Sequence, residues 1–101
     1  MIRSKSNKHP RVSFVIPARN EVDTIGTLFK RINVTMLKIK TRYEIVFIDD
    51  GSTDETFIKM EELHEKHPTI VSVIKHRGNW GKSIALQSGF RIARGEIIIT
   101  M

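Results

Sequence analysis

Two adjacent carboxylates, Asp49 and Asp50, end an apolar run and are the residues of this sequence best suited to bind a ligand. A carboxylate at a strand tip can accept a hydrogen bond from a base N–H or a sugar hydroxyl, and it can help to hold a divalent cation. Ser52 and Glu55 fit a capping box for the helix that follows, with Thr53 as a further cap. Because these caps free at least one aspartate, we predict that Asp50 binds ligand; a turn or cap role is the alternative.

A basic, glycine-containing loop lies further along, in the segment 76–95, which reads HRGNWGKSIALQSGFRIARG. Arg77 and Lys82 could bind phosphate there, helped by the N–H groups at a helix start, or they could be merely solvated. The loop is not a P-loop, because that pattern requires glycine where this chain has His76.

The elements that must position these residues alternate between strand and helix. We expect strands at 12–17, 43–48, 70–74 and 96–101. We expect one helix that begins after Asn20, with Asn20 as its cap, and further helices from Glu55 to about His67 and at 83–93. The apolar strands indicate burial on both faces, so we predict an α/β fold: a doubly wound, mostly parallel sheet with helices on both faces. Ligands bind beyond the carboxyl ends of such strands, which selects the loops after the first, second and fourth strands.

Length and composition limit the classes of function. The 101 residues allow one domain, and the absence of cysteine excludes disulfides, thiolate zinc sites and cysteine nucleophiles. No apolar run approaches the roughly 18 residues that span a bilayer, and no signal peptide is evident, so we expect a cytoplasmic segment. His64 and His67 lie one helical turn apart, which is a weak metal signal. We also expect a core that includes the phenylalanines Phe14, Phe29, Phe47, Phe57 and Phe90. We expect Trp80 to pack there too, with contact to a ligand as the alternative.

The formal charge of +6 suggests an anionic partner. Four of the positive charges precede or begin the first apolar run: Arg3, Lys5, Lys8 and Arg11. We expect residues 1–10 to form a basic, solvated leading tail and residues 11–101 to form the domain; contact of the tail with membrane lipid or nucleic acid is the alternative. Aromatic residues are few and are not interleaved with basic ones, so no nucleic-acid partner is expected.

Taken together, three motifs resemble a known family. The order IPARNE (16–21), FIDDGSTDET (47–56) and HRGNWGKSIALQSGFRIARGEIIIT (76–100) resembles family 2 glycosyltransferases of the GT-A fold. It is most similar to the branch that transfers a sugar from a nucleotide donor to a polyprenyl (dolichyl or undecaprenyl) phosphate. The resemblance covers residues 11–101.

The resemblance implies a nucleotide pocket built from three loops. The residues that it places there are Pro17, Arg19, Glu21, Ile48, Asp50 and Lys82. Asp50 would accept a hydrogen bond from the N–H of uracil or guanine. Arg19 stands where the family often has tyrosine; an arginine can stack over the base or reach a phosphate.

The resemblance also implies parts that this sequence does not contain. An Asp-x-Asp motif holding Mg²⁺ or Mn²⁺ would begin just after Met101, and the catalytic base and the acceptor site would follow. We therefore expect no metal site and no identifiable catalytic residue within the chain, which should bind a UDP- or GDP-sugar weakly and turn nothing over. The full-length relative would act by inverting displacement on a lipid-phosphate or glycan acceptor, at the cytoplasmic face of a membrane.

Two other classes of function stay open. The chain could be a non-catalytic nucleotide-binding or scaffold module, or a phosphoacceptor module of the receiver type. A receiver needs a further aspartate at the end of a later strand, whereas the third strand here ends Ile74-Lys75-His76. An uncovered sheet edge also predicts self-association of the chain.

Overall fold

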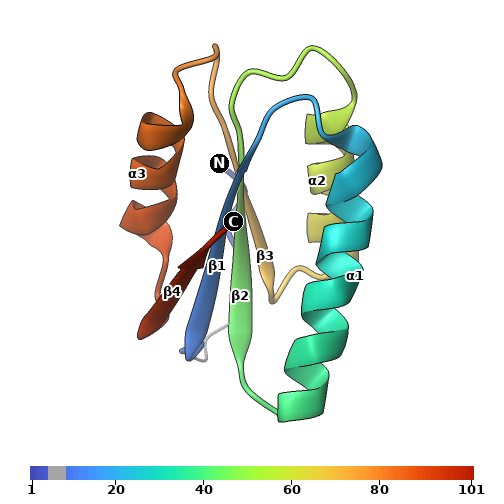
Figure 1. Cartoon of the computed structure of the whole chain (residues 1–101), viewed down its shortest axis with the longest axis vertical. Helices are drawn as coiled ribbons and strands as arrows, with labels where there is room; N and C mark the ends of the chain where they lie inside the picture. The colour runs from blue at the N-terminus through green and yellow to red at the C-terminus, as the bar shows by residue number, and fades with distance from the viewer. Residues whose placement is uncertain (5–8) are drawn as a thin grey trace.

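The computed structural model describes residues 1–4 and 9–101, and strands and helices alternate in it from Val12 to Thr100 (Figure 1). In chain order the elements are β1 (Val12–Ala18), α1 (Val22–Ile39), β2 (Tyr43–Asp49), α2 (Thr56–Lys66), β3 (Val71–Lys75), α3 (Lys82–Ile92) and β4 (Ile97–Thr100). Each expected strand and helix is present, with its ends shifted by one or a few residues.

The four strands form one parallel sheet in the order β3-β2-β1-β4. The chain runs outward from β1 through β2 to β3 and then returns to pair β4 with the opposite edge of β1. Strand order therefore reverses between β1 and β4, and ligands of such sheets bind near this reversal, beyond the carboxyl ends of the strands. The predicted doubly wound α/β fold is confirmed.

Helices cover both faces of the sheet, and the alternation of strand residues divides the core between them. In Figure 1, α1 and α2 lie on one side and α3 on the other. Ile45 and Phe47 belong to the larger core cluster, with residues of α1 and α2, while Val46 and Ile48 pack with Ala85 of α3. Both faces of β2 are thus buried, as its continuous apolar run predicts.

Helix α3 approaches the sheet so closely that only glycine fits at position 89. A Cβ atom there would lie 2.4 Å from Cγ1 of Val15 and 2.9 Å from Cδ1 of Ile48. This contact places α3, and the loop that precedes it, directly against β1 and β2.

The charged residue Glu44, near the start of β2, is buried with only 2% of its surface exposed. Its carboxylate accepts hydrogen bonds from the hydroxyl of Ser13 (2.5 Å) and the backbone N–H of Arg94 (2.6 Å), and Ser13 Oγ accepts from the N–H of Gly95 (2.7 Å). These bonds satisfy the buried charge. They also tie the connection between α3 and β4 to the amino-terminal end of the sheet.

The two edges of the sheet differ. At the β3 edge, Ile2 and Val73 exchange two backbone hydrogen bonds of 2.7 Å, and the N–H of Ser4 donates to Ser72 Oγ. Residues 1–4 of the expected solvated tail are thus attached to the sheet. Lys5 and Lys8 lie outside the described residues.

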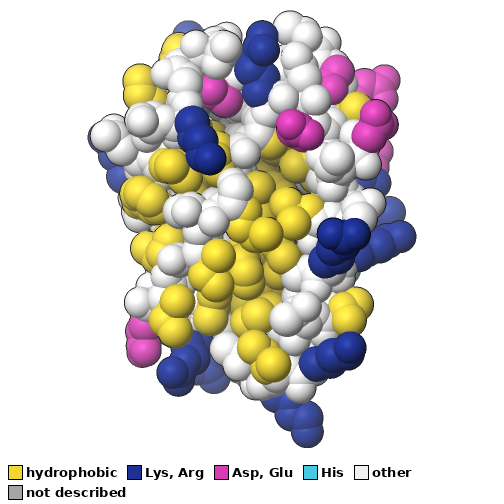
Figure 2. Space-filling model, in the orientation of Figure 1, with side chains coloured by type: hydrophobic (Ala, Val, Ile, Leu, Met, Phe, Trp, Pro, Cys, Tyr) yellow, Lys and Arg dark blue, Asp and Glu magenta, His cyan; other side chains and the backbone are white. Residues whose placement is uncertain are grey.

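Strand β4 forms the opposite edge and is not buried, contrary to the expectation for an apolar strand. Ile97, Ile98 and Ile99 expose 40–44% of their surface. Figure 2 shows hydrophobic side chains gathered across the middle of this view, with most of the visible acidic side chains toward its upper end. The sequence cannot predict this exposure, because an apolar run is the same whether or not a neighbouring element covers it.

The aromatic residues follow the core prediction only in part. Phe14, Phe29 and Phe47 are buried, and Phe57 is partly buried against the same cluster. Phe90 and Trp80 expose 44% and 52% of their surface, so the prediction that they are core residues is wrong. Phe90 lies on the outer side of α3, and Trp80 lies in the loop before it.

Candidate functional site

The loops that follow β1 and β2 are joined by hydrogen bonds at the carboxyl ends of the strands. The N–H of Asn20 donates to Ser52 Oγ (2.9 Å), and Asn20 Oδ1 accepts from the N–H of Thr53 (2.8 Å). The N–H of Glu21 donates to Thr56 Oγ1 (2.9 Å). The two loops therefore form one connected rim of the sheet.

These contacts correct two predicted helix caps. Asn20 does not cap α1, which begins at Val22 after Glu21, and Ser52 does not form a capping box with Glu55. Asn20 has a left-handed backbone (φ 55°), which asparagine tolerates, and its side chain bonds the neighbouring loop instead. Asp54 Oδ1 accepts from the N–H of Thr56 at the start of α2 (2.9 Å).

Asp50 is buried, with 6% of its surface exposed, and both of its carboxylate oxygens accept internal hydrogen bonds. Oδ1 accepts from the N–H of Trp80 (3.0 Å) and from Nδ1 of His76 (3.2 Å), and Oδ2 accepts from the N–H of Gly81 (3.0 Å). Burial raises the pKa of Asp50, but the hydrogen bonds from His76, Trp80 and Gly81 and the charge of His76 outweigh burial and leave the pKa below its ordinary value. Asp50 thus fixes the loop between β3 and α3.

The prediction that Ser52 and Thr53 cap α2, and so leave Asp50 free, is therefore wrong. Neither residue caps α2, and the Asp50 carboxylate has three internal donors. Its predicted hydrogen bond to a nucleotide base remains a prediction. The structure assigns Asp50 first to the organisation of the rim.

His76 links Asp50 to α3 and was not singled out as a site residue from the sequence. The ring is 4% exposed, its Nδ1 contacts Asp50, and its Nε2 lies 2.9 Å from Ser88 Oγ. Because a carboxylate only accepts, Nδ1 carries the proton, and in the neutral ring the Ser88 hydroxyl donates to Nε2. The indole of Trp80 stacks on the imidazole with the ring centroids 4.5 Å apart and the planes 28° from parallel. No local sequence pattern predicts that His76 contacts Asp50, Ser88 and Trp80.

Gly51 lets the β2–α2 turn and the β3–α3 loop approach each other. Its φ of +79° is a left-handed conformation that favours glycine, and a Cβ there would lie 2.6 Å from the carbonyl carbon of Gly78. The backbone of the third loop thus packs directly against the turn that follows Asp50, and all three loops share one rim.

Asp49 contrasts with its neighbour, because one of its oxygens has no partner. The residue is 1% exposed; Oδ1 accepts from the N–H of Ser52 (3.2 Å), while Oδ2 makes no hydrogen bond within residues 1–4 and 9–101. An unpaired buried acceptor costs about 1–3 kcal/mol, so it marks a position where a donor is expected. Strand alternation could have distinguished the two aspartates, since consecutive residues point to opposite sides.

The other predicted site residues lie on this rim with different exposures. Pro17 is half-buried at the end of β1, and Arg19, Glu21 and Lys82 are exposed. Ile48 is fully buried against Val15 and Ala85, so its side chain belongs to the core beneath α3. Glu21 Oε2 accepts from the hydroxyl of Thr24 (3.0 Å).

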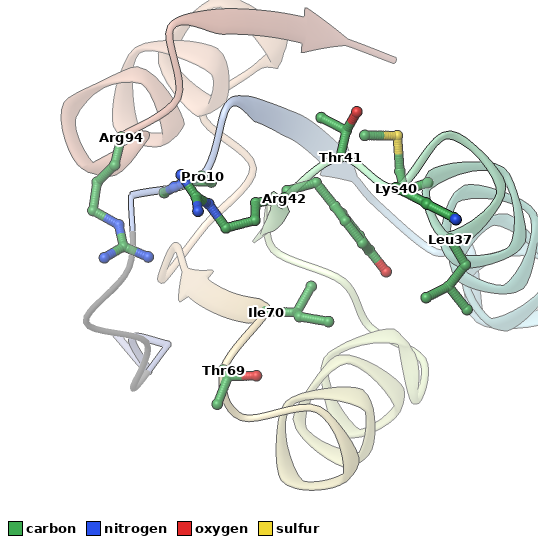
Figure 3. A pocket seen from close by; sticks show the side chains of 10 residues that line it. Pro10, Leu37, Lys40, Thr41, Arg42, Thr69, Ile70 and Arg94 are labelled. Carbon is green, nitrogen blue, oxygen red and sulfur yellow. The ribbon is translucent and has the colours of Figure 1, made fainter.

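A cavity of about 420 Å³ lies at the other end of the sheet, where β2 begins and β3 follows its preceding turn (Figure 3). Leu37 and Ile70 contribute apolar walls, and Lys40, Arg42 and Arg94 contribute positive charge. Because this cavity is at the amino ends of parallel strands, it is separate from the rim formed by Asp49, Asp50 and the three loops.

A model of glycosyl transferase family 2 matches residues 13–101. A dodecaprenyl-phosphate galacturonate synthase from Rhizobium johnstonii is 32% identical over 90 residues, covering 89% of this chain and 27% of the relative. A dolichol-phosphate mannosyltransferase from Pyrococcus furiosus is 38% identical over 91 residues, covering 90% of this chain and 25% of the relative. The chain therefore spans about a quarter of the length of these relatives.

A solved structure agrees with these relatives. A mannosyltransferase from Pyrobaculum calidifontis, in complex with GDP-Man and Mn²⁺, superposes with a TM-score of 0.76 at 30% identity, covering 91% of this chain and 27% of that one. The resemblance found in the three motifs is thereby confirmed. Within the described part of the chain, no helix combines the length and apolar character needed to cross a membrane.

Proposed function

Because this chain belongs to glycosyl transferase family 2, we propose that it forms the nucleotide-sugar-binding part of an inverting glycosyltransferase. The donor is a UDP- or GDP-linked hexose, and the reaction is a single displacement at the anomeric carbon in which the nucleoside diphosphate leaves. The similarity to a structure holding GDP-Man supports a nucleotide-sugar donor.

The observation that carries the proposal is the unpaired Oδ2 of Asp49 beside the loop that follows β1. Uracil and guanine each present a ring N–H that a carboxylate can accept, and such a bond would remove the cost of the orphan oxygen. We propose Asp49 as a further acceptor for the edge of the base. The contact that the family resemblance implies for Asp50 stays a prediction, and Asp50 also holds the adjacent loop.

The remaining contacts follow from exposure and charge. Arg19 and Lys82 are exposed cations on the rim and would contact the diphosphate or, for Arg19, the face of the base. Pro17 and Glu21 would line the base and ribose from the first loop. Ile48, being fully buried, would act through packing below the base.

A divalent cation, Mg²⁺ or Mn²⁺, belongs to the proposed activity of the whole protein, where it would neutralise charge on the departing diphosphate. The residues described here do not form a site for it alone: within 1–4 and 9–101, no three His, Asp or Glu side chains come together as metal ligands.

The acceptor is proposed from the relatives. Both named above carry a polyprenyl or dolichol phosphate in their names. We propose a lipid-phosphate acceptor for the whole protein, which would act at the cytoplasmic face of a membrane, with the catalytic base supplied outside residues 1–101. Alone, the chain should bind nucleotide and transfer no sugar.

Calorimetry tests the proposal. Titration of the 101-residue chain with UDP and GDP, with and without Mn²⁺, should show nucleotide binding. This binding should not depend on prior phosphorylation of an aspartate, which is the modification that a receiver module undergoes. Asp49→Ala should abolish binding, and Glu55→Gln, an exposed carboxylate of the same rim, should not change it. Absence of binding by either nucleotide, or equal binding by Asp49→Ala, would contradict the proposal.

We also propose that the isolated chain self-associates through the β4 edge. Ile97, Ile98 and Ile99 leave an apolar edge strand uncovered, and such edges pair readily with other strands.

A further inference from the structure

Trp80 combines two properties that are unexpected in a side chain without a ligand: it is half-exposed, yet fixed. It exposes 52% of its surface, more than Phe90 or any isoleucine of β4. Its indole stacks on the ring of His76, and its backbone N–H donates to Asp50. A large apolar ring that is held in place while facing solvent is pre-organised for contact with a ligand.

The support beneath Trp80 is built from buried polar groups. His76 is 4% exposed and is fixed from two directions, by Asp50 at Nδ1 and by Ser88 at Nε2. Asp50 in turn bonds the backbone of Trp80 and Gly81, which fixes the loop on both sides of the indole. Neither hydrophobic burial nor helix capping requires this chain of contacts.

We propose that Trp80 is a ligand-contacting residue whose indole stacks on the base of the nucleotide, and that Asp50, His76 and Ser88 are positioning residues that hold it there. The inference rests on the proposed nucleotide-binding function. A base needs a partner for its edge and a partner for its face. The carboxyl end of β2 bears on both: Asp49 Oδ2 lacks a donor, and the backbone of Trp80 is anchored to Asp50, whose side chain points to the other side of the strand. Aromatic stacking tolerates different bases, so uracil and guanine are both suitable.

The chain contains a single tryptophan, so one indole N–H signal in a ¹H–¹⁵N spectrum reports on this position alone. UMP and GMP, which lack the sugar donor group, should shift that signal. Trp80→Leu should weaken binding of UMP, GMP and the corresponding UDP- and GDP-sugars by about tenfold. Trp80→Phe should restore most of the affinity, and Phe90→Leu, an exposed aromatic on the outer side of α3, should change nothing.

The positioning residues are tested by coupling to Trp80. Ser88→Ala removes only the hydroxyl that contacts Nε2 of His76; it should move the indole signal of the free protein and weaken UMP binding. In a Trp80→Leu background the same change should have no further effect on affinity. Ser83→Ala, an exposed serine of the same helix, is the matched control. A general effect on folding would add to the loss caused by Trp80→Leu, whereas a positioning effect would not.

These experiments distinguish failure of the proposed nucleotide-binding function from failure of the role inferred for Trp80. If the wild-type chain binds no nucleotide, both the proposed function and this inference fail. If the wild type binds UMP and Trp80→Leu binds it equally well, or loses affinity only for sugar nucleotides, the function stands and the stacking role of Trp80 is overturned. If Ser88→Ala weakens binding equally in both backgrounds, the positioning role is overturned.

Discussion

Asp49 and Asp50 are neighbours in the chain, yet they have opposite environments. Asp50 accepts three hydrogen bonds and organises the β3–α3 loop, while Asp49 keeps one buried oxygen without a partner. Burial of an oxygen without a hydrogen-bond donor lowers the free energy of unfolding, so Asp49 is unfavourable for the stability of the ligand-free chain. The proposed N–H of a nucleotide base would supply the donor that Oδ2 lacks.

Replacement of Asp49 by asparagine should separate stability from binding. The amide introduced by Asp49→Asn would keep an acceptor for the N–H of Ser52 but would place an NH₂ group, which donates and cannot accept, where Oδ2 lies. Because both side chains leave one buried polar group unpaired, we expect the free energy of unfolding to change by less than about 1 kcal/mol and nucleotide binding to be lost. Urea denaturation and calorimetry on the same preparation check this; lower stability with unchanged binding would show that the orphan oxygen has a structural role.

Asp50 should make the fold sensitive to acid. Its pKa is lowered in the folded chain, so the carboxylate contributes stability that is present above its ordinary pKa of about 3.9 and lost as pH falls through the lower folded value. Asp50→Asn should cost about 1–3 kcal/mol at neutral pH, because the amide cannot accept from Gly81 as well as from Trp80 and His76. The urea midpoint of Asp50→Asn should also vary less with pH than that of the wild type. The measurement should cover the range from about pH 5 to about pH 2, which brackets the ordinary pKa of an aspartate. Parallel pH profiles for both proteins would contradict this role.

At the scale of elements, α3 carries the third loop of the rim, and its placement depends on the absence of a side chain at Gly89. The helix lies against Val15 and Ile48, so the loop before it reaches the carboxyl ends of β1 and β2. Close packing of this kind transmits a small displacement of the helix to the site.

Gly89→Ala should therefore destabilise the chain although alanine favours helix. A Cβ 2.4 Å from Val15 Cγ1 forces α3 outward, at a cost of about 2 kcal/mol. Gln87→Ala on the exposed side of the same helix should be neutral or slightly stabilising. Thermal unfolding of both variants checks the pair; a higher melting temperature for Gly89→Ala would show that the helix does not pack this closely.

The sequence predicts the elements better than their ends. Apolar runs and helical spacing locate all seven elements, because burial of one face or both is recorded in residues close together in the chain. The predicted helix caps were wrong because Asn20 bonds Thr53, a residue 33 positions away. A local sequence pattern cannot predict a partner so distant in the chain. His76 was missed for the same reason, since its role depends on Asp50 and Ser88.

The whole molecule is asymmetric in both charge and exposure. The rim, with Asp49, Asp50 and the three loops, lies at the carboxyl ends of the strands, and a basic cavity lies at the opposite ends (Figure 3). Between them runs the uncovered edge of β4 (Figure 2). This edge contrasts with β3, which is paired by Ile2.

A charge on the open edge should suppress self-association. Ile98→Lys places a cation on β4, and edge lysines oppose strand pairing. We expect light scattering at high concentration to show oligomers of the wild type and fewer of Ile98→Lys, while Ile58→Lys on α2 leaves the distribution unchanged. A wild type that is monomeric at every concentration would refute the edge proposal without affecting nucleotide binding.

All of the binding proposals require that one nucleotide binds where the three loops meet. Titration of the ¹⁵N-labelled chain with UDP or GDP examines this requirement residue by residue, because each backbone N–H reports its own surroundings. We predict that the largest shifts fall in residues 17–21, 49–54 and 76–82 and that Asp49→Asn removes them. Shifts concentrated instead around Leu37, Arg42 and Ile70, at the cavity on the opposite end of the sheet, would show that the nucleotide site has been misplaced.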